Sequence, residues 1–317
     1  MNIVFFGTSS FAAEILVDLL HKKFPIVAVV TRPDRPKGRQ LKRSPPPVKE
    51  VLLQRFPQLP LFQPERASTP EFASILETFS PDLFVIAAYG EIIKQFLLDI
   101  PRIACINVHA SLLPKYRGAA PIQRALLAGE KETGITIIAM TAQMDAGDML
   151  AQATFSISEE MNAGELEKEL SVLGAKLVSD VIIQLEKGTE ARIPQDVSKM
   201  TLASKIPPEE EKIDWNRPAE YLHNLIRALA PTPGAWTSLY IDGSLKRLKI
   251  MQARIRTMAH SLPPGEILSC NPKEWIVACG KEALELLKVQ LEGKKMLSAR
   301  EFLIGTKKNL SFTGLLH

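Results

Sequence analysis

The sequence predicts an α/β protein in which a Rossmann-like domain with a parallel sheet is followed by a small OB-like β-barrel. Short apolar runs rich in β-branched residues at 2–6, 26–31 and 83–88 alternate with helical patterns, as the buried strands of parallel sheets do. Toward the C-terminus the pattern changes to short alternating strands. The length of 317 residues exceeds the roughly 100–200 residues of one typical domain, which also favours two domains.

The first domain is expected to span 1–188. Two further apolar runs predict strands at 103–108 and 135–140. Between them, Pro121 suits the first turn of a helix, because its missing N–H has no partner to lose there. A long amphipathic helix is expected over 163–186.

The second domain is expected to span 206–317, after a proline-containing linker at 189–205. A helix is expected at 218–229. The dipeptide Asp242-Gly243 lies between two alternating runs, which is a strong signal for a two-residue hairpin turn. The later elements are a strand at 274–278, a strand at 283–290 and a short helix opened by a Ser298/Glu301 capping box.

Composition excludes several classes of protein. Hydrophobic residues make up 46% of the chain and charged residues 23%, as in ordinary globular proteins. The sequence contains no run of about 18 apolar residues that would span a membrane, and its N-terminus does not resemble a signal peptide. The three cysteines are far apart and odd in number, which argues against a disulfide framework and a zinc site. We therefore expect a cytoplasmic protein.

Two regions carry an excess of positive charge. The net charge is +4, and the whole excess lies in 206–317, where 16 basic residues face 12 acidic ones. A second basic cluster occupies 32–49, where Asp34 is the single acidic residue. Two basic regions on a near-neutral body are compatible with a polyanionic partner such as a nucleic acid, and also with an ordinary solvated surface.

The chemistry-bearing residues lie around the expected strand at 103–108. Asn107 and His109 are two apart, so their side chains share one face of the strand near its C-terminal end. Open α/β sheets place their sites at that end. An amide and an imidazole there could hold a developing oxyanion and transfer a proton. Asp145, in a turn after the next strand, could fix the His109 tautomer. A structural hydrogen-bonded pair is the competing interpretation of Asn107 and His109.

The segment around these residues resembles a known family. The runs Asn107–Pro114, Tyr116–Gln123 and Asp145–Asp148 are similar to the core of the folate-dependent formyltransferases. Outside this core the chain resembles the methionyl-tRNA formyltransferase family, most clearly in the basic stretch from Thr31 to Lys49 and in the stretch from Pro231 to Trp236. The resemblance covers essentially the whole chain.

The resemblance implies transfer of a formyl group from 10-formyltetrahydrofolate to the amine of methionine on the initiator tRNA. It assigns oxyanion stabilisation to Asn107 and protonated His109, and orientation of His109 to Asp145. It requires no metal. The residues it implies for the folate site are Ser111, Leu112, Leu113, Pro114, Tyr89, Gly90 and Asp148.

The tRNA would be held by basic residues on both domains through phosphate contacts, which position a substrate and make binding salt-dependent. The candidates are Arg35, Lys37, Arg39, Lys42 and Arg43 in the first domain and Lys246, Arg247 and Lys249 in the second, with Arg254 and Arg256 nearby. We expect a monomer, because these surfaces must stay accessible.

Several alternatives remain open. NAD is not expected, since only Gly7 follows the first strand where a dinucleotide fingerprint needs three glycines. The acceptor could instead be a small amine, such as a purine-precursor ribonucleotide or an amino sugar. A formyl-tetrahydrofolate hydrolase would share the Asn, His and Asp residues but has no use for the basic stretch. A protein of another class, which binds RNA without catalysis, would need none of the three.

Overall fold

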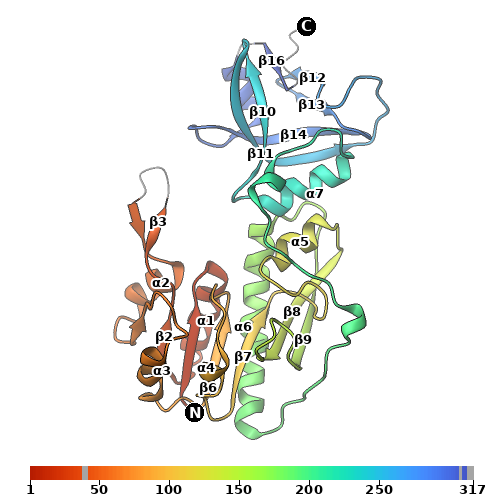
Figure 1. Ribbon diagram of the computed structural model, residues 1–317. Helices are drawn as coiled ribbons and strands as arrows, with labels where there is room; N and C mark the ends of the chain where they lie inside the picture. Colours follow the sequence, from red (N-terminus) through yellow and green to blue (C-terminus); the bar gives the residue numbers. More distant parts are fainter. Residues whose placement is uncertain (38–41, 307–308, 313–317) are drawn as a thin grey trace. The chain divides into compact units, whose positions relative to one another are not determined.

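The structure is a computed structural model that describes residues 1–37, 42–306 and 309–312 (Figure 1). Its contacts group the chain into two compact units. The first unit comprises Met1–Pro121, Glu132–Ser156 and Glu167–Ser204, and the second comprises Ile122–Lys131, Ile157–Leu166 and Lys205–His317. The segment 189–204 therefore groups with the first unit. Within the described residues, no helix is long and apolar enough to cross a membrane.

The first unit is built on one mixed sheet whose strand order is β5-β2-β1-β6-β7-β8-β9. The strands are β1 (Ile3–Gly7), β2 (Ile26–Val30), β5 (Leu61–Phe62), β6 (Leu83–Ala87), β7 (Ala104–His109), β8 (Glu132–Ala139) and β9 (Met149–Ser156). The neighbours from β5 to β7 run parallel, whereas β8 pairs antiparallel with β7 and with β9. The expected parallel sheet is confirmed for the five strands from β5 to β7, whereas the antiparallel direction of β8 and β9 was not predicted.

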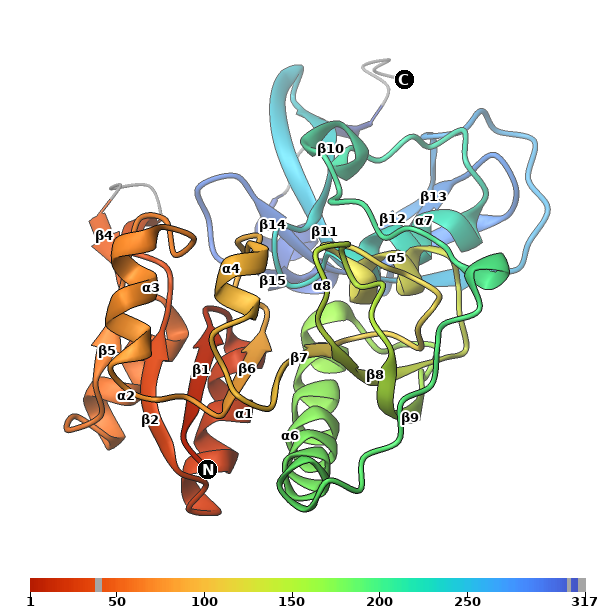
Figure 2. The same ribbon diagram turned by 60° about the horizontal axis from the view of Figure 1, so that its bottom comes forward.

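Helices cover both faces of this sheet. One face carries α3 (Pro70–Glu77) and α4 (Gln95–Leu98) (Figure 2). Residues of these helices form a buried cluster with Phe6 of β1 and Phe84 of β6. The other face packs against α1 (Ser10–His21) and α6 (Ala163–Lys187). Gly174 of α6 approaches so closely that a Cβ there would meet the Val108 side chain at 3.2 Å. β7 is thus fixed from both faces, which gives its C-terminal end a rigid support.

Shorter elements complete the first unit. The basic stretch forms a hairpin of β3 (Arg35–Lys37) and β4 (Lys42–Ser44), followed by α2 (Pro47–Arg55). The segment after α6 contains one 3₁₀ turn, Val197–Lys199. Sequence patterning indicated neither the hairpin nor β9, because two- and three-residue strands and half-exposed edge strands carry little apolar periodicity.

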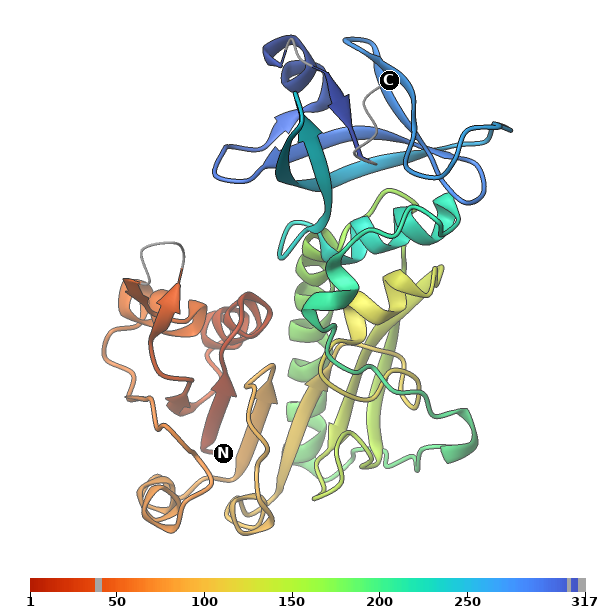
Figure 3. The same cartoon turned by 45° about the horizontal axis from the view of Figure 1, so that its top comes forward.

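The second unit is an antiparallel barrel, whose strands run from teal to blue in Figure 3, with the strand order β12-β13-β14-β11-β10-β16 and with β15 beside β14. Its strands are β10 (Ala235–Ile241), β11 (Ser244–Arg256), β12 (Ile267–Asn271), β13 (Glu274–Ala278), β14 (Ala283–Leu291), β15 (Leu297–Ser298) and β16 (Leu310–Ser311). Its helices are α5 (Pro121–Leu127), a 3₁₀ turn at Pro208–Glu211, α7 (Ala219–Leu229) and α8 (Ala299–Gly305).

The core of the second unit fills the space between the strands and α7. Trp275 is fully buried and stacks on Phe302 and Phe312 at centroid distances of 5.4 and 5.6 Å. The expected hairpin turn at Asp242 and Gly243 is confirmed, with both residues at positive φ. The capping box at the start of α8 is confirmed as well.

Candidate functional site

Two polar side chains leave the sheet at the end of β7. Asn107 pairs with Ile86 of β6 and with Ile138 of β8, so it sits between a parallel and an antiparallel neighbour. His109 is the last residue of the strand and is only 5% exposed. Both residues therefore have the common orientation and the position at the strand's C-terminal end that the sequence predicted.

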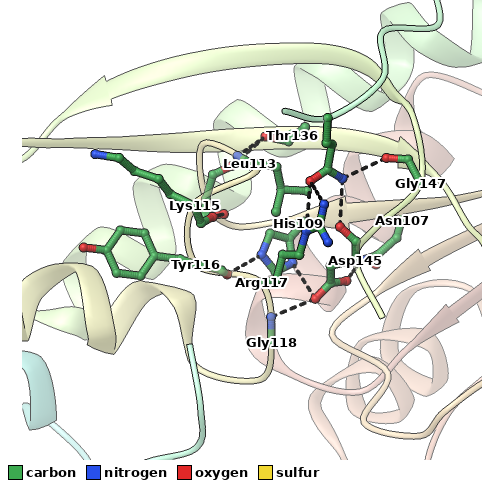
Figure 4. A network of polar contacts seen from close by, with 12 residues as sticks. Asn107, His109, Leu113, Lys115, Tyr116, Arg117, Gly118, Thr136, Asp145 and Gly147 are labelled. Carbon is green, nitrogen blue, oxygen red and sulfur yellow. Dashed lines mark hydrogen bonds and ion pairs between the residues drawn. The ribbon is translucent and has the colours of Figure 1, made fainter. Parts of the chain in front are cut away.

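Asp145 meets both residues from a turn between β8 and β9 (Figure 4). Its Oδ1 accepts a 3.4 Å hydrogen bond from Asn107 Nδ2, and its Oδ2 lies 3.6 Å from His109 Nδ1. The Asp145 backbone is held at φ 50°, in the left-handed region that costs most residues free energy but that aspartate tolerates better. The structure thus brings the three expected catalytic residues together.

The loop after β7 supplies two backbone groups to this cluster. The carbonyl oxygen of Tyr116 lies 2.9 Å from His109 Nε2, and the N–H of Gly118 donates to Asp145 Oδ2 over 2.9 Å. Gly118 has φ 126°, and a Cβ there would lie 2.7 Å from the carbonyl oxygen of Ala203. Only glycine fits this backbone position, so the N–H that holds Asp145 depends on the residue type at 118.

These contacts limit what the cluster can do chemically. The two ring nitrogens of His109 face two oxygen acceptors, and an imidazolium satisfies both because it donates from each nitrogen. Among the described residues, the Asn107 amide nitrogen has its single hydrogen bond with Asp145, although it carries two N–H groups. The arrangement can donate hydrogen bonds to a developing oxyanion and move a proton.

The loop 111–114 is braced from β8 and β9. The Thr136 hydroxyl donates to the carbonyl oxygen of Ser111 and accepts from the N–H of Leu113. Gln152 donates to the carbonyl oxygen of Leu113 over 3.0 Å. Ser111 is fully buried, and its hydroxyl donates to the carbonyl oxygen of Lys115. The side chains of Ser111 and Leu113 therefore point into the protein, and the loop backbone is held in one conformation.

The other residues expected at the folate site lie after β6 and in the turn of Asp145. Tyr89 is 2% exposed and packs edge-on against Phe6 at 5.5 Å. Burial and the nearby Glu91 carboxylate raise the pKa of Tyr89 to about 12. Gly90 has φ 85°, and a Cβ there would meet no atom within 4 Å, so the backbone borders open space. Asp148 is half-buried, and its carbonyl oxygen accepts from the N–H of Ala139.

Ion pairing divides the basic stretch into two groups. Arg32 pairs with Glu91, and Lys49 binds Asp34 at 2.9 Å, so these two cations brace the first unit. Arg35 is exposed and pairs with Glu65 at 2.7 Å. Arg43 is exposed and has no ion-pair partner within the described ranges. The backbones of Lys37 and Lys42 are register partners in the β3–β4 hairpin, and Arg39 lies outside the described residues.

The basic candidates of the second unit lie on β11, where Lys249 is the register partner of Trp236 on β10. The Arg247 guanidinium lies 4.0 Å from the centre of the Trp236 ring, and Lys212 lies 5.7 Å from it. Lys246 is exposed, while Lys249 donates to the carbonyl oxygen of Pro233. The nearby Arg254 and Arg256 both face Glu285 instead, at 4.0 and 3.1 Å.

Two residues near the cluster were not predicted to have a role. Gln195 donates to the carbonyl oxygens of Asp145 and Gly147, and Arg117 donates to Gln195. Arg117 belongs to a segment that carries the family resemblance, which is a signal that could have singled it out. Gln195 lies in the expected linker, and no local pattern marks it. Across the described parts of the chain, no group of three His, Cys, Asp or Glu residues could hold a metal.

Comparisons with known proteins find relatives over almost the whole chain. A family model described as "Formyl transferase" matches residues 1–182, and one described as "Formyl transferase, C-terminal domain" matches residues 205–307. A methionyl-tRNA formyltransferase of Protochlamydia amoebophila is 48% identical over 98% of this chain and 96% of its own length. One of Chlamydia muridarum is 41% identical over 98% of both.

Solved structures share the fold at lower sequence identity. The methionyl-tRNA formyltransferase from Clostridium thermocellum is 17% identical with a TM-score of 0.55, over 82% of this chain and 95% of that one. HypX from Aquifex aeolicus, solved with tetrahydrofolic acid, is 17% identical with a TM-score of 0.65, over 95% of this chain and 46% of that one. At these identities the likeness concerns the fold alone.

Proposed function

Because the chain belongs to the formyl transferase family, and within it to the methionyl-tRNA formyltransferases, we propose that it transfers the formyl group of 10-formyltetrahydrofolate to the α-amino group of methionyl initiator tRNA. The observation that carries the proposal is the convergence of Asn107, His109 and Asp145 at the end of β7. The near full-length similarity to relatives with that name supports the choice of substrate.

In the proposed reaction, the amine nitrogen attacks the formyl carbon. A new N–C bond forms, and negative charge develops on the formyl oxygen. The Asn107 amide donates its second N–H to that oxygen, and the protonated His109 ring donates from Nε2 once this N–H has exchanged the Tyr116 carbonyl for the oxyanion. The amine proton passes to the leaving nitrogen of the folate as the old C–N bond breaks, and the oxygen returns to a carbonyl. Asp145 orients the His109 ring through Nδ1 and assists the proton transfer.

The residues around the loop 111–114 are suited to a folate donor. Thr136 and Gln152 fix the loop backbone, so binding of a ligand to its N–H and C=O groups would cost little additional conformational entropy. The open space beside Gly90 admits a ligand close to the backbone, as glycine commonly allows. We propose Ser111–Pro114, Tyr89, Gly90 and Asp148 as the lining of this site, with Ser111 and Leu113 acting through their backbone.

We assign the binding of tRNA to basic residues of both units, two of which, Arg35 and Arg247, also form ion pairs with Glu65 and Glu211. In the first unit these are Arg35, Lys37, Arg39, Lys42 and Arg43, and in the second they are Lys246, Arg247 and Lys249. The Trp236 ring and its stacked Arg247 offer a flat cationic surface of the kind that phosphates and bases contact. A monomer acting in the cytoplasm remains our prediction.

The proposal is tested with a panel of acceptors and one donor, 10-formyltetrahydrofolate. The acceptors are methionyl initiator tRNA, methionyl elongator tRNA, free methionine and an amino-sugar nucleotide. Formylation of the initiator tRNA far above the other three is expected. Preferred transfer to the sugar would favour the small-amine alternative. Release of formate with no acceptor formylated would favour the hydrolase.

A further inference from the structure

We propose that Gln195 is a positioning residue that sets the place of the Asp145 carboxylate. We also propose that the segment 193–203 holds the turn and the loop that orient His109 and Asp145. This inference rests on the proposed function and deepens it. Gln195 is 50 residues from Asp145 in the chain, in a segment whose sequence is typical of a linker. All the contacts that carry the inference lie within the first unit.

The Gln195 amide spans the turn that bears Asp145. Its Nε2 donates to the carbonyl oxygens of Asp145 and Gly147, both over 2.8 Å. Two N–H groups on one nitrogen match two carbonyl acceptors, so the donor capacity of the amide is fully used. These bonds hold the turn in which Asp145 has φ 50°. A backbone in the left-handed region persists where surrounding contacts over-determine it, and Gln195 supplies two of these contacts.

Arg117 fixes the orientation of that amide. Its Nε and Nη2 donate to Gln195 Oε1 over 3.0 and 2.7 Å, and Arg117 is only 6% exposed. A guanidinium has donors and no acceptor, so it faces the oxygen of the amide and never its nitrogen. The Gln195 nitrogen must therefore point toward the Asp145 turn. A buried arginine, a glutamine and the turn form one continuous chain of hydrogen bonds.

The same segment also holds the loop that faces His109. Thr201 accepts through its carbonyl oxygen from the N–H of Arg117 and through its hydroxyl from the N–H of Tyr116, at 2.9 and 2.8 Å. The N–H of Ala203 donates to the carbonyl oxygen of Arg117 over 2.7 Å. This loop carries the Tyr116 carbonyl that meets His109 and the Gly118 N–H that meets Asp145. The segment 193–203 thus braces both members of the His109–Asp145 pair.

Substitution of Gln195 should impair the chemical step and spare substrate binding. Gln195→Ala is expected to lower kcat by about tenfold to a hundredfold, since small displacements of catalytic groups cost this much. The KM values for folate and tRNA should stay within about twofold, because Gln195 acts through Asp145 and not on the substrates. Gln143→Ala is the matched control, because Gln143 is an exposed glutamine on the same connection between β8 and β9.

A nearly isosteric variant separates positioning from packing. Gln195→Glu preserves the volume and the acceptor for Arg117, but it turns an oxygen toward the two carbonyls that need a donor. We expect Gln195→Glu to lose as much kcat as Gln195→Ala while its melting temperature stays near that of the wild type. Wild-type kcat in Gln195→Glu would overturn the proposal, because packing alone would then be sufficient.

Two further readouts report on the path through Asp145. In a double-mutant cycle, Gln195→Ala added to Asp145→Ala should cost little additional kcat, whereas losses that multiply would overturn the proposal. In protein labelled with ¹⁵N-histidine, which has five histidines, the ring signals of His109 should shift in Gln195→Ala and not in Gln143→Ala. Unchanged His109 signals would also contradict the proposal. The spectra need no turnover, so they test this inference even if the wild type transferred no formyl group and the proposed function failed.

Discussion

His109 Nε2 lies 2.9 Å from the carbonyl oxygen of Tyr116, a residue held at φ 61° in the loop that follows β7. On its other side, His109 Nδ1 faces Asp145 Oδ2 at 3.6 Å. The ring is therefore oriented by a loop and by a turn, and not by its own strand alone. Because the segment 193–203 holds both supports, the reactive geometry depends on parts of the chain about 90 residues beyond the histidine itself.

Asn107→Ala should abolish most of the transfer activity. The Asn107 amide lies beside the His109–Asp145 pair and is assigned as a donor to the oxyanion, and loss of one oxyanion donor typically lowers kcat by about 10²–10³-fold. The affinity for tRNA, measured by filter binding, should stay near that of the wild type. Wild-type turnover in this variant would refute the assigned role of Asn107. Asn271→Ala, in the exposed β12–β13 turn, is the control.

Asp145→Asn should be impaired even though it preserves the size of the side chain. The two carboxylate oxygens accept from Asn107 Nδ2 and from the Gly118 N–H, whereas an amide has one oxygen that accepts and an NH₂ group that cannot. We expect a loss of kcat of about 10²–10⁴-fold, the usual contribution of general acid–base catalysis. Combining Asp145→Asn with His109→Gln should add little to the larger single loss. Fully multiplicative losses in steady-state kinetics would show that the two residues act independently.

Replacing Arg39 and Arg43 together by alanine should weaken tRNA binding and leave folate use unchanged. Each lost phosphate contact should reduce the slope of log K against log salt by about 1. The measurement is the KM for tRNA over a series of salt concentrations. Lys176→Ala, an exposed cation on α6, serves as the control. An unchanged KM and slope would show that the basic stretch does not bind tRNA and is an ordinary solvated surface.

Arg247 should contribute to tRNA binding through its planar group as well as its charge. Arg247→Ala removes both, whereas Arg247→Lys keeps the charge and loses the 4.0 Å stacking on Trp236. The KM for tRNA should therefore rise most in Arg247→Ala and to an intermediate value in Arg247→Lys. Lys273→Ala, an exposed cation in the β12–β13 turn, should have no effect. Equal KM values for the wild type and Arg247→Ala would exclude this surface.

Asp82 should make the stability of the first unit depend on pH. A hydrogen bond from the Asn2 N–H, together with Arg102, lowers the pKa of Asp82, although burial opposes this. A folded-state pKa below the unfolded value stabilises the protein above the unfolded pKa, and this stability is lost as pH falls through the folded pKa. Asp82→Asn should thus have a lower free energy of unfolding than the wild type at pH 7, and this difference should become smaller as the pH falls. A difference in unfolding free energy that stays constant with pH, measured by denaturant titration, would contradict this prediction.

The sequence predicted the central strand and its site because both signals are local. Asn107 and His109 alternate with buried residues, so the period of the strand alone places them on one side. The direction of β8 was not predictable, because an apolar run indicates burial and says nothing about the orientation of its neighbour. The β3–β4 hairpin was missed for another reason, since three-residue strands of charged residues have no apolar period.

The hydrogen bonds that hold the catalytic residues in place could not be predicted from the sequence. Gln195 and Thr201 act on residues that are 50 and 85 positions away, and no spacing rule connects them. Proline and the absence of periodicity made 189–205 appear to be a plain connection. The partners of Gly118 were equally hidden, although a glycine in an irregular loop can mark a close approach of the backbone. Contacts at long range in the chain require the structure.

A single-turnover assay that follows a labelled formyl group from 10-formyltetrahydrofolate to methionyl initiator tRNA is the most direct test of formyl transfer by this protein. We predict formylmethionine on the initiator tRNA with the wild-type protein, and almost none with Asn107→Ala or with methionyl elongator tRNA as the acceptor. Label that appears as free formate while every tRNA stays unformylated would contradict the central claim. Equal transfer to initiator and elongator tRNA would contradict the choice of substrate.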